Sequence, residues 1–232
     1  MATVASVTPS YTDGRVVVYD HFLPEHEQQE ILRYFESARF RKILPDAWGR
    51  AYRLANGESL VGQEVISSRR GPEDSTPAYP TKTPLDLAIQ RLLACEKELS
   101  AIIGSYGDSW AQFTMCPYVY PAACGLGWHT DAHCAGAYIY YAHPRWSPHW
   151  GGELLVEYCE EDCVPGGALS RGIVQNEALE SALKRGMGYY FRPLPNRLVV
   201  LRSCTPHMIV NVHSAAGDNL RLSLSGFFLR TE

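Results

Sequence analysis

The sequence predicts one mainly β domain, a barrel or jelly roll with flanking helices. In the second half of the chain, many short runs rich in β-branched and aromatic residues alternate with turn residues. No regular succession of strand and helix indicates a parallel sheet. The chain has 232 residues, 46% of them hydrophobic, which is enough for one well-buried core. We therefore expect a single domain over 1–232, with a β core at about 110–230 and helical support with a candidate lid at 15–105.

The first hundred residues predict a strand, two helices and one irregular segment. Residues 15–19 form a short β-branched strand, and a helix over about 24–38 opens with a proline, whose missing N–H costs little in a first turn. Residues 40–82 lack periodicity, which is typical of a lid, a binding loop or disorder. A second helix, over about 83–104, begins at a Thr-Pro pair and ends at a glycine. We expect this helix to lie on the outside of a sheet.

From residue 110 onward the pattern becomes that of short strands. The expected strands cover 112–120, the stretch around His129, 137–141, 151–156, 189–192, 197–201, 208–212 and 221–229. An excursion at 159–188 interrupts them, and a short helix is expected within it at about 177–184.

Charge and hydropathy exclude several classes of protein. The net charge is −4 and the basic residues are scattered between acids, so we expect neither nucleic acid nor an anionic membrane as a partner. No apolar run is long enough to span a membrane, and the N-terminus lacks the features of a signal peptide. We expect a soluble, cytoplasmic protein with a small-molecule substrate. The seven cysteines form an odd set without a CxxC pair, so we expect reduced thiols.

The candidate site is built around Trp128-His129-Thr130-Asp131. Alternate side chains of a strand share a face, so His129 and Asp131 should point the same way, roughly 7 Å apart along the backbone. An imidazole and a carboxylate on one face can bind the same metal ion. A distant histidine, His207, would complete two histidines and one carboxylate. That set leaves coordination positions open and is diagnostic of non-haem Fe(II) oxygenases.

The last predicted strand carries a charged side chain and two hydroxyl groups on one face. Residues 221–225 alternate between polar and apolar side chains, which places Arg221, Ser223 and Ser225 together. A buried guanidinium needs an anionic partner, because an unpaired buried charge is costly. A carboxylate that accepts two parallel hydrogen bonds is its natural match. The strand therefore predicts a binding site for a carboxylate ligand.

Together these motifs resemble those of the Fe(II)- and 2-oxoglutarate-dependent dioxygenases, in particular the prolyl-4-hydroxylase-like branch. The resemblance covers about 110–230, and weakly 15–38. The resemblance rests on the following residues and motifs: the HxD pair, His207, the Arg-x-Ser motif at 221–223, Tyr120, Gly151-Gly152-Glu153-Leu154 and Pro195-Asn196-Arg197-Leu198-Val199-Val200. Two departures are that the glycine usually found three residues after the tyrosine stands at Gly125, and that Arg221 replaces the lysine common in collagen-type prolyl hydroxylases.

The resemblance implies a double-stranded β-helix, a jelly-roll or cupin-like fold, and an oxidoreductase. It implies Fe(II), O2 and the co-substrate 2-oxoglutarate, with hydroxylation of an unactivated C–H and release of succinate and CO2. Iron would bind His129, Asp131 and His207, and the distal carboxylate of 2-oxoglutarate would bind Arg221, Ser223 and Tyr120.

Three functions stay open on the sequence alone. The leading one is hydroxylation of a small molecule, an amino acid or a natural-product intermediate, because the chain has no second domain or extended peptide-binding segment. A peptidyl or protein prolyl hydroxylase is the runner-up. A non-catalytic metal-binding cupin is the third, although it has no need of the Arg-x-Ser motif. The residues predicted for the substrate site are Trp128, His149, Trp150 and, if 40–82 is a lid, Arg69 and Arg70.

Overall fold

The strands form two sheets. The structure, a computed structural model, describes residues 7–43, 58–67, 76–158 and 183–231. Within these ranges nine strands belong to a major sheet and four to a minor sheet. Every pairing between neighbouring strands is antiparallel. This agrees with the mainly β class expected from the sequence.

The major sheet is built around three long strands. Its order is β1 (Tyr11–Thr12), β2 (Val16–Tyr19), β11 (Leu198–Arg202), β8 (Cys134–Tyr141), β13 (Arg221–Arg230), β6 (Trp110–Tyr120), β4 (Leu60–Val61) and β3 (Arg41–Lys42), and β5 (Val65–Ile66) also pairs with β6. The expected strands in these regions are confirmed to within a few residues. All of β8 is buried, as are most of β6 and β13, because both faces of the sheet are covered.

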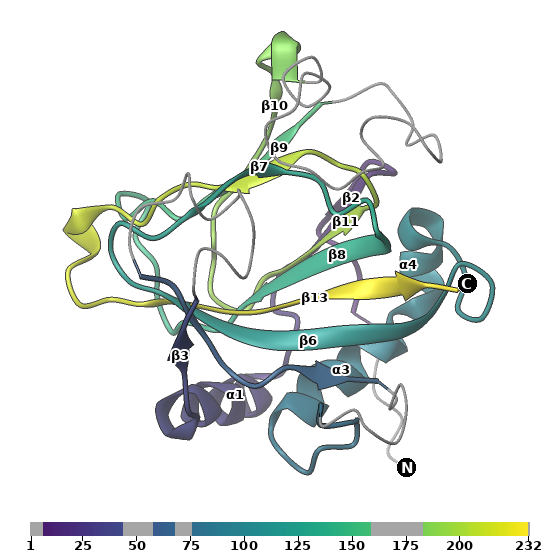
Figure 1. Ribbon diagram of the computed structural model, residues 1–232, viewed down its shortest axis with the longest axis horizontal. Coiled ribbons are helices and arrows are strands. Elements are labelled where there is room, and N and C mark those ends of the chain that lie inside the picture. The colour runs from purple at the N-terminus through teal and green to yellow at the C-terminus, as the bar shows by residue number, and fades with distance from the viewer. Residues whose placement is uncertain (1–6, 44–57, 68–75, 159–182, 232) are drawn as a thin grey trace.

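The minor sheet holds the two histidines of the predicted metal site. Its order is β10 (Gly188–Phe191), β9 (Leu154–Glu157), β12 (His207–Ile209) and β7 (Leu126–His129). Figure 1 shows β7, β9 and β10 set apart from β8, β13 and β6 of the major sheet. His207 lies directly opposite His129, whereas Ile209 pairs with Leu126, so a β-bulge lies between the two pairs.

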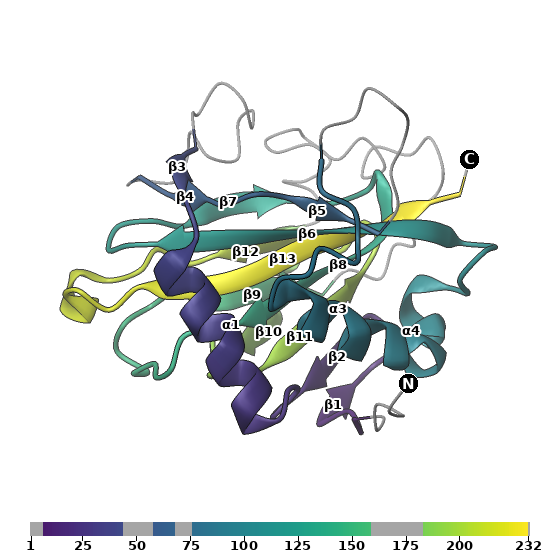
Figure 2. The same ribbon diagram turned by 90° about the horizontal axis from the view of Figure 1, so that it is seen from below.

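Three helices cover the face of the major sheet that is turned away from the minor sheet, as Figure 2 shows from below. They are α1 (Glu25–Ser37), α3 (Leu85–Ala94) and α4 (Glu96–Ile103), and two short 3-10 turns, η2 (Leu183–Arg185) and η3 (Ser214–Ala216), lie elsewhere. The helix expected at 24–38 is confirmed, and it buries Ile31 and Phe35. The predicted position of the second helix outside a sheet is also confirmed.

The second helix differs from the prediction in being divided at Cys95. This residue has φ −92° and ψ 8°, and its N–H donates to the carbonyls of Leu92 and Leu93, so α3 ends there and α4 begins anew. The predicted stop at Gly104 is confirmed. Gly104 has φ +78°, and a Cβ there would lie 2.1 Å from Ser109 Oγ, so only glycine fits this position.

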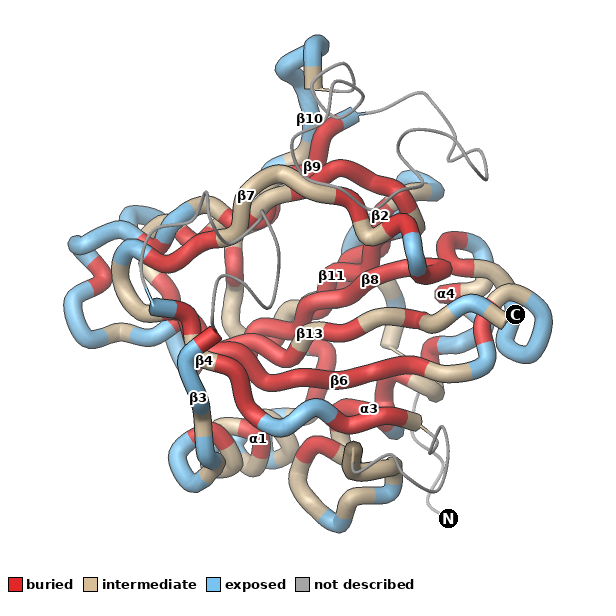
Figure 3. Tube along the Cα trace, viewed as in Figure 1, coloured by how far each residue is buried: buried red, intermediate tan, exposed pale blue. Residues whose placement is uncertain are grey.

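Buried residues form two cores, one on each face of the major sheet. The outer core lies between the helices and the sheet and includes Ile89, Trp110 and Phe228. The inner core lies between the two sheets and includes Ile139 and Leu154. Figure 3 shows the buried strands running through the centre of the molecule. Full burial of such side chains stabilises the fold by about 1.5 to 3 kcal/mol each.

The segment 40–82 contains strands where an irregular excursion was expected. β3, β4 and β5 all fall within it, and β4 and β5 pair with β6. Pairing satisfies backbone groups at that edge of β6, which outweighs the weak β pattern of the sequence. Residues 44–57 and 68–75 lie outside the described residues, and with them Arg69, Arg70 and the rest of the predicted lid. Most of the excursion at 159–188, with the helix expected at 177–184, also lies outside them.

The cysteines only partly match the prediction of reduced thiols. Cys95, Cys116, Cys124 and Cys134 are free and buried. Cys204 is disulfide-bonded, so the prediction is wrong for this residue. The absence of a CxxC motif does not exclude a disulfide bond between cysteines that are distant in sequence.

In the part of the chain that the structure describes, no helix combines the length and apolar character needed to cross a membrane.

Candidate active site

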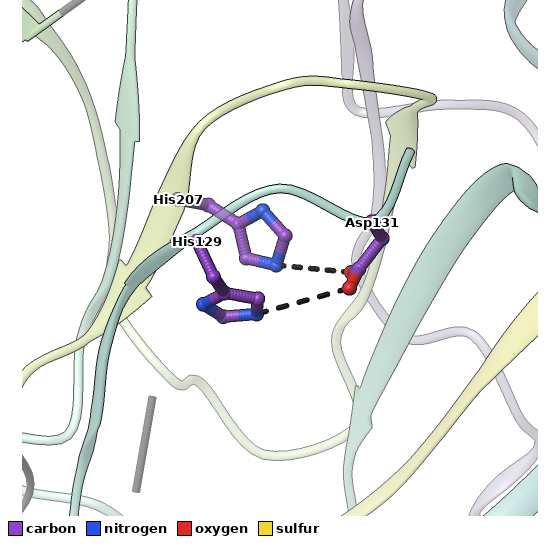
Figure 4. Close-up of side chains that lie close together, drawn as sticks. All are labelled: His129, Asp131 and His207. Atoms are coloured by element: carbon purple, nitrogen blue, oxygen red, sulfur yellow. Dashed lines mark ion pairs between the residues drawn. The ribbon is translucent and has the colours of Figure 1, made fainter. Parts of the chain in front are cut away.

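Three side chains converge where β7 and β12 lie side by side. His129 ends β7, His207 begins β12, and Asp131 follows β7 by two residues. Their metal-binding atoms all lie within 4.8 Å of one another. His207 Nε2 lies 3.3 Å from Asp131 Oδ2, and His129 Nε2 lies 3.9 Å from Asp131 Oδ1 (Figure 4). The predicted triad is therefore assembled in one place.

Asp131 reaches this place in a different way from the prediction. The sequence suggested that it shares a strand face with His129, but β7 ends at His129 and Asp131 lies in the following turn. The backbone carbonyl of Asp131 accepts hydrogen bonds from Cys134 Sγ at 2.9 Å and from Cys134 N at 3.3 Å. These contacts with the start of β8 fix the turn, and with it the direction of the carboxylate.

Both histidines are held by backbone carbonyls. Nδ1 of His129 lies 2.7 Å from the carbonyl oxygen of Gly127, and Nδ1 of His207 lies 2.8 Å from that of Thr205. In each ring, Nδ1–H donating to the carbonyl leaves Nε2 as the lone-pair nitrogen. Since both Nε2 atoms face Asp131, the rings are oriented as metal ligands before any ion is bound.

Burial and mutual charge set the protonation of the triad. Burial lowers the pKa of His129 to about 4, helped by the charge of His207 and opposed by Asp131. Burial favours protonation of Asp131, but the hydrogen bond and charge of His207, with the charge of His129, outweigh it and lower its pKa to about 2. Burial would lower the pKa of His207, yet its hydrogen bond to Asp131 raises it. A neutral imidazole and a carboxylate are therefore ready at neutral pH, and metal binding would displace any proton that His207 shares with Asp131.

The residues present fit a ferrous ion. Two imidazole nitrogens and one carboxylate oxygen can contact one ion from the same side. No fourth His, Cys, Asp or Glu of the described chain joins this group, so further coordination positions face the cavity. This donor set is the one found in non-haem Fe(II) oxygenases, in contrast to the closed four-ligand sites of structural zinc.

The triad opens into a cavity between the two sheets. Its volume is about 270 Å³, near the lower end of the range for small-molecule sites. Its apolar walls are Leu126, Ala137, Ile139, Leu154, Leu201 and Ile209. Of the residues predicted to bind the co-substrate, Tyr120 and Ser223 line it. The pairing of Ser223 with Tyr118 and Tyr141 places this hydroxyl at the centre of the major sheet.

Arg221 lies two residues beyond Ser223 on the same face of β13, and it is fully buried. Its Nε donates to the carbonyl of Gly152 at 2.9 Å. Its guanidinium carbon lies 5.0 Å from the ring centroid of Tyr141 and 5.5 Å from that of Tyr120. Both Nη atoms lack a hydrogen-bond partner. Two aromatic rings therefore contact the cation, and one of them, that of Tyr120, lines the cavity, whereas Arg221 itself is not among the lining residues. Its two terminal nitrogens remain available for a hydrogen-bond acceptor.

Gly152 makes room for this arginine. It has φ +75°, and a Cβ there would lie 2.8 Å from Arg221 Cδ. The predicted Gly151-Gly152 motif therefore has a structural reason: only glycine lets the β9 entry pass so close to the guanidinium stem.

Three residues predicted for the substrate site are not brought to the cavity. Trp128 precedes His129 in β7 but is not among the residues that line the cavity. His149 is exposed in the turn before β9, and Trp150 packs edge-on against Trp146, with Arg145 over its ring. Periodicity could not place His149 and Trp150, because the segment 142–153 forms no strand.

The sequence analysis missed several residues that line the cavity. Alternation along β6 could have found Thr114, Cys116 and Tyr118, which share a face with Tyr120. Glu64, His133 and Phe227 also line it, and Phe227 packs edge-on against His133 at 5.1 Å. Glu64 comes from the segment between β4 and β5, where no strand was predicted.

The fold of the protein is similar to that of several solved structures. No family model matches it, and no curated protein matches its sequence. A prolyl-4-hydroxylase from Pseudomonas putida superposes with a TM-score of 0.56 at 19% identity, covering 94% of this chain and 93% of that one. A 2OG-Fe(II) oxygenase family oxidoreductase from Burkholderia pseudomallei gives 0.57 at 14% identity, covering 94% and 86%.

A third similar structure is a prolyl hydroxylase from Trichoplax adhaerens in complex with a peptide fragment of the hypoxia inducible factor oxygen degradation domain. Its TM-score is 0.54 at 16% identity, covering 93% of this chain and 84% of that one. At such identities the likeness establishes the fold. The double-stranded β-helix expected from the motifs is therefore confirmed.

Proposed function

We propose that this protein is an Fe(II)- and 2-oxoglutarate-dependent dioxygenase that hydroxylates an unactivated C–H of a small molecule. The observation that carries the proposal is the joint presence, on the inner faces of the two sheets, of a two-histidine, one-carboxylate group and a buried arginine with two unpartnered Nη atoms. The fold shared with 2OG-Fe(II) oxygenases supports it. A metal-binding cupin without activity would have no use for the arginine.

In this proposal His129, Asp131 and His207 hold the iron, and Arg221, Ser223 and Tyr120 bind the distal carboxylate of 2-oxoglutarate. When bound, iron activates O2 and couples oxidative decarboxylation of 2-oxoglutarate to hydroxylation. One oxygen atom enters the substrate as the alcohol, and the other enters succinate as CO2 leaves.

The chain itself supplies orientation and a dry environment. Arg221 would fix the distal carboxylate of the co-substrate, and the triad would hold the ion that binds its other end, so the co-substrate would be oriented between the two. Ile139, Leu154 and Leu201 keep water away from the reacting atoms, which strengthens the charge interactions inside the cavity and limits side reactions.

Two of the similar structures are described as prolyl hydroxylases, one with a bound peptide, and this favours a second candidate. A peptidyl prolyl hydroxylase would use the same iron and co-substrate residues. Proline-containing peptides therefore belong in the substrate screen beside free amino acids, and succinate formation coupled to a product heavier by one oxygen atom decides between the two.

The proposal predicts that the protein binds one Fe(II) through the triad. Asp131→Ala removes the carboxylate and should lower iron affinity by at least about tenfold, because the ion then lacks the charged ligand. Equilibrium dialysis without oxygen measures the stoichiometry. His133→Ala is the matched control, since it removes a histidine that lines the same cavity but is outside the triad. Full iron binding by Asp131→Ala, or loss of iron in the control alone, would refute the assignment.

A further inference from the structure

Trp146 is a buried tryptophan that has no part in the site described so far. It lies between β8 and β9, in a stretch without regular structure, and is 8% exposed. Its indole Nε1–H donates to the carbonyl of Gly151 at 2.8 Å. The next carbonyl along the chain, that of Gly152, accepts from Arg221 Nε. Trp146 is therefore one peptide unit away from the backbone group that holds the guanidinium.

Gly152 lies between the side chains of Trp146 and Arg221. A Cβ at this position would lie 3.4 Å from Trp146 Cζ2, 2.8 Å from Arg221 Cδ and 3.3 Å from Arg221 Nε. Gly151 and Gly152 both have positive φ, at 69° and 75°. Because glycine has a wide choice of backbone conformations, the direction of the Gly152 carbonyl depends on the neighbours of this glycine pair.

The backbone that follows β12 is the second neighbour of the glycine pair. A Cβ at Gly151 would lie 2.3 Å from the carbonyl oxygen of Asn211, and Gly151 forms an isolated antiparallel bridge with Val212. The glycine pair is thus held between this backbone on one side and Trp146 on another. Removing the indole N–H would leave the carbonyl of Gly151 without that donor and would free the pair to shift.

The contacts that start at Trp146 also return to Arg221 by a second route. The ring centroid of Trp146 lies 4.7 Å from that of His143, which lies 5.9 Å from that of Tyr141. The guanidinium carbon of Arg221 lies 5.0 Å from the Tyr141 ring centroid. All four side chains are buried. Since a close-packed interior transmits small displacements, a shift of Trp146 should reach the guanidinium.

We propose, on the basis of the dioxygenase function above, that Trp146 is a positioning residue for the binding of 2-oxoglutarate. Its N–H fixes the glycine pair, and the Gly152 carbonyl fixes Arg221 Nε. The planar fork of the guanidinium is then held in the orientation that two parallel hydrogen bonds to the distal carboxylate require. Trp146 is not among the residues that line the cavity, so it acts through Arg221 and does not touch the co-substrate.

The test is a double-mutant cycle on 2-oxoglutarate binding. Trp146→Phe keeps an aromatic ring and removes the N–H. The protein is loaded with Fe(II) without oxygen, and the near-visible Fe(II)–2-oxoglutarate charge-transfer band is titrated. The affinity of Trp146→Phe should be about threefold to tenfold weaker than that of the wild type, as expected for the loss of one hydrogen bond. In the Arg221→Ala background, the same substitution should change the affinity by less than about twofold, because the residue through which it acts is gone.

Trp110→Phe is the matched control. Trp110 is 1% exposed, and its indole N–H donates to the carbonyl of Gly104 at 3.0 Å in the outer core. This variant loses the same kind of hydrogen bond on the other face of the major sheet, so its affinity for 2-oxoglutarate should stay within about twofold of wild type. Iron stoichiometry should be unchanged in every variant, because neither tryptophan is a ligand.

Circular dichroism shows whether each variant folds. If Trp146→Phe does not fold, Trp146 is replaced instead by β-(3-benzothienyl)alanine, which carries sulfur in place of the N–H and has nearly the same shape. The same weakening of 2-oxoglutarate binding is expected from this replacement, with the same dependence on Arg221.

Three results would overturn the inference: an unchanged affinity when the indole N–H of Trp146 is removed, an equal loss with and without Arg221, or an equal loss in Trp110→Phe. Failure of the proposed function gives a different signal. If the band never forms in the wild type, the proposed function falls, and the positioning role with it. If the band forms and Arg221→Ala weakens it while Trp146→Phe does not, the proposed function stands and only the positioning role falls.

Discussion

Arg221 shows how a buried charge can be kept without an ion pair. The rings of Tyr120 and Tyr141 and the carbonyl of Gly152 contact the guanidinium, and these contacts offset part of the cost of removing it from water. They leave both Nη atoms unpartnered. The protein keeps this arrangement at a cost in stability, which is typical of a residue retained for binding.

Arg221→Ala should weaken 2-oxoglutarate binding without affecting iron. The variant removes a bidentate, charge-assisted hydrogen bond and leaves the co-substrate carboxylate with only the hydroxyl groups of Ser223 and Tyr120, a loss of about 2 to 5 kcal/mol. The apparent affinity should therefore fall by roughly 30-fold or more. Arg221→Lys keeps the charge but not the planar fork, so it should fall between wild type and alanine. An anaerobic titration of the Fe(II)–2-oxoglutarate charge-transfer band measures all three proteins.

Equal midpoints for wild type and Arg221→Ala would contradict the co-substrate assignment. Iron stoichiometry is the internal control, because Arg221 is not a ligand. Circular dichroism of each variant excludes a general loss of structure as the cause of weaker binding.

At the scale of single residues, the sequence predicted site residues correctly where both the residue type and its spacing pointed to the same role. His129, Asp131 and His207 were predicted from their types, and Arg221 with Ser223 from strand alternation. Trp128, His149 and Trp150 were chosen only for nearness in sequence, and the structure places them away from the cavity. Glu64 was missed because its position depends on pairing with β6, some fifty residues later, which no local pattern reveals.

At the scale of elements, strands were more predictable than their connections. The alternating runs that became β6, β8, β11 and β13 are long enough for periodicity to identify them. The bulge between β7 and β12 was not predictable, because it depends on the register of two strands almost eighty residues apart. This bulge brings both Leu126 and His129 to the cavity although they are three residues apart.

Asn196 joins the helical layer to the sheets. It lies in the turn before β11 with φ +60°, a conformation that asparagine tolerates better than most residues. Its Oδ1 accepts from Leu23 N at 2.9 Å, and its Nδ2 donates to Leu23 O at 2.7 Å. The amide thus satisfies both backbone groups of Leu23 where the chain enters α1. The contact is buried and links residues 173 positions apart.

Asn196→Ala should destabilise the fold by roughly 2 to 4 kcal/mol. The variant leaves a buried N–H and a buried carbonyl unsatisfied and places alanine at positive φ. Denaturant-induced unfolding measures the change. Asn196→Gly separates the two causes, because glycine removes the amide but accepts the backbone conformation.

Asn219→Ala, near the exposed turn at η3, is the matched control and should change stability by less than about 1 kcal/mol. A wild-type midpoint for Asn196→Ala would show that the contact with Leu23 does not stabilise the fold.

At the scale of the whole molecule, the same side chains stabilise the fold and form the candidate site. The inner core that holds the two sheets together also supplies the walls of the cavity, since Ile139, Leu154, Leu201 and Ile209 belong to both. Two histidines lie at this core: His129 lines the cavity, and the buried His143 packs against Tyr141 and Trp146. Conditions that charge these groups should therefore loosen the contact between the sheets.

His143 predicts a loss of stability in mild acid. Burial lowers its pKa to about 4, helped by the charge of Arg221 and opposed by a hydrogen bond to the carbonyl of Pro193. In the unfolded chain the pKa of a histidine is about 6.5. Between these values the unfolded state binds more protons, so the free energy of unfolding falls as the pH is lowered from about 6.5 to about 4, by about 3 kcal/mol in total. Above pH 6.5 both states are neutral and the effect vanishes.

His143→Gln should flatten this pH dependence. Glutamine can still donate to the carbonyl of Pro193 but does not titrate, so the slope should decrease by up to about 1.4 kcal/mol per pH unit. The measurement is denaturant unfolding of metal-free protein at a series of pH values from about 4.5 to about 7.5, spaced about half a unit apart. His149→Gln, which alters an exposed histidine, is the matched control and should keep the wild-type slope.

His129 contributes in the same direction in metal-free protein, so some slope should persist in His143→Gln. If the free energy of unfolding depends on pH in the same way in wild type and in His143→Gln, then protonation of His143 does not destabilise the fold. The loss of stability in acid would then have another cause.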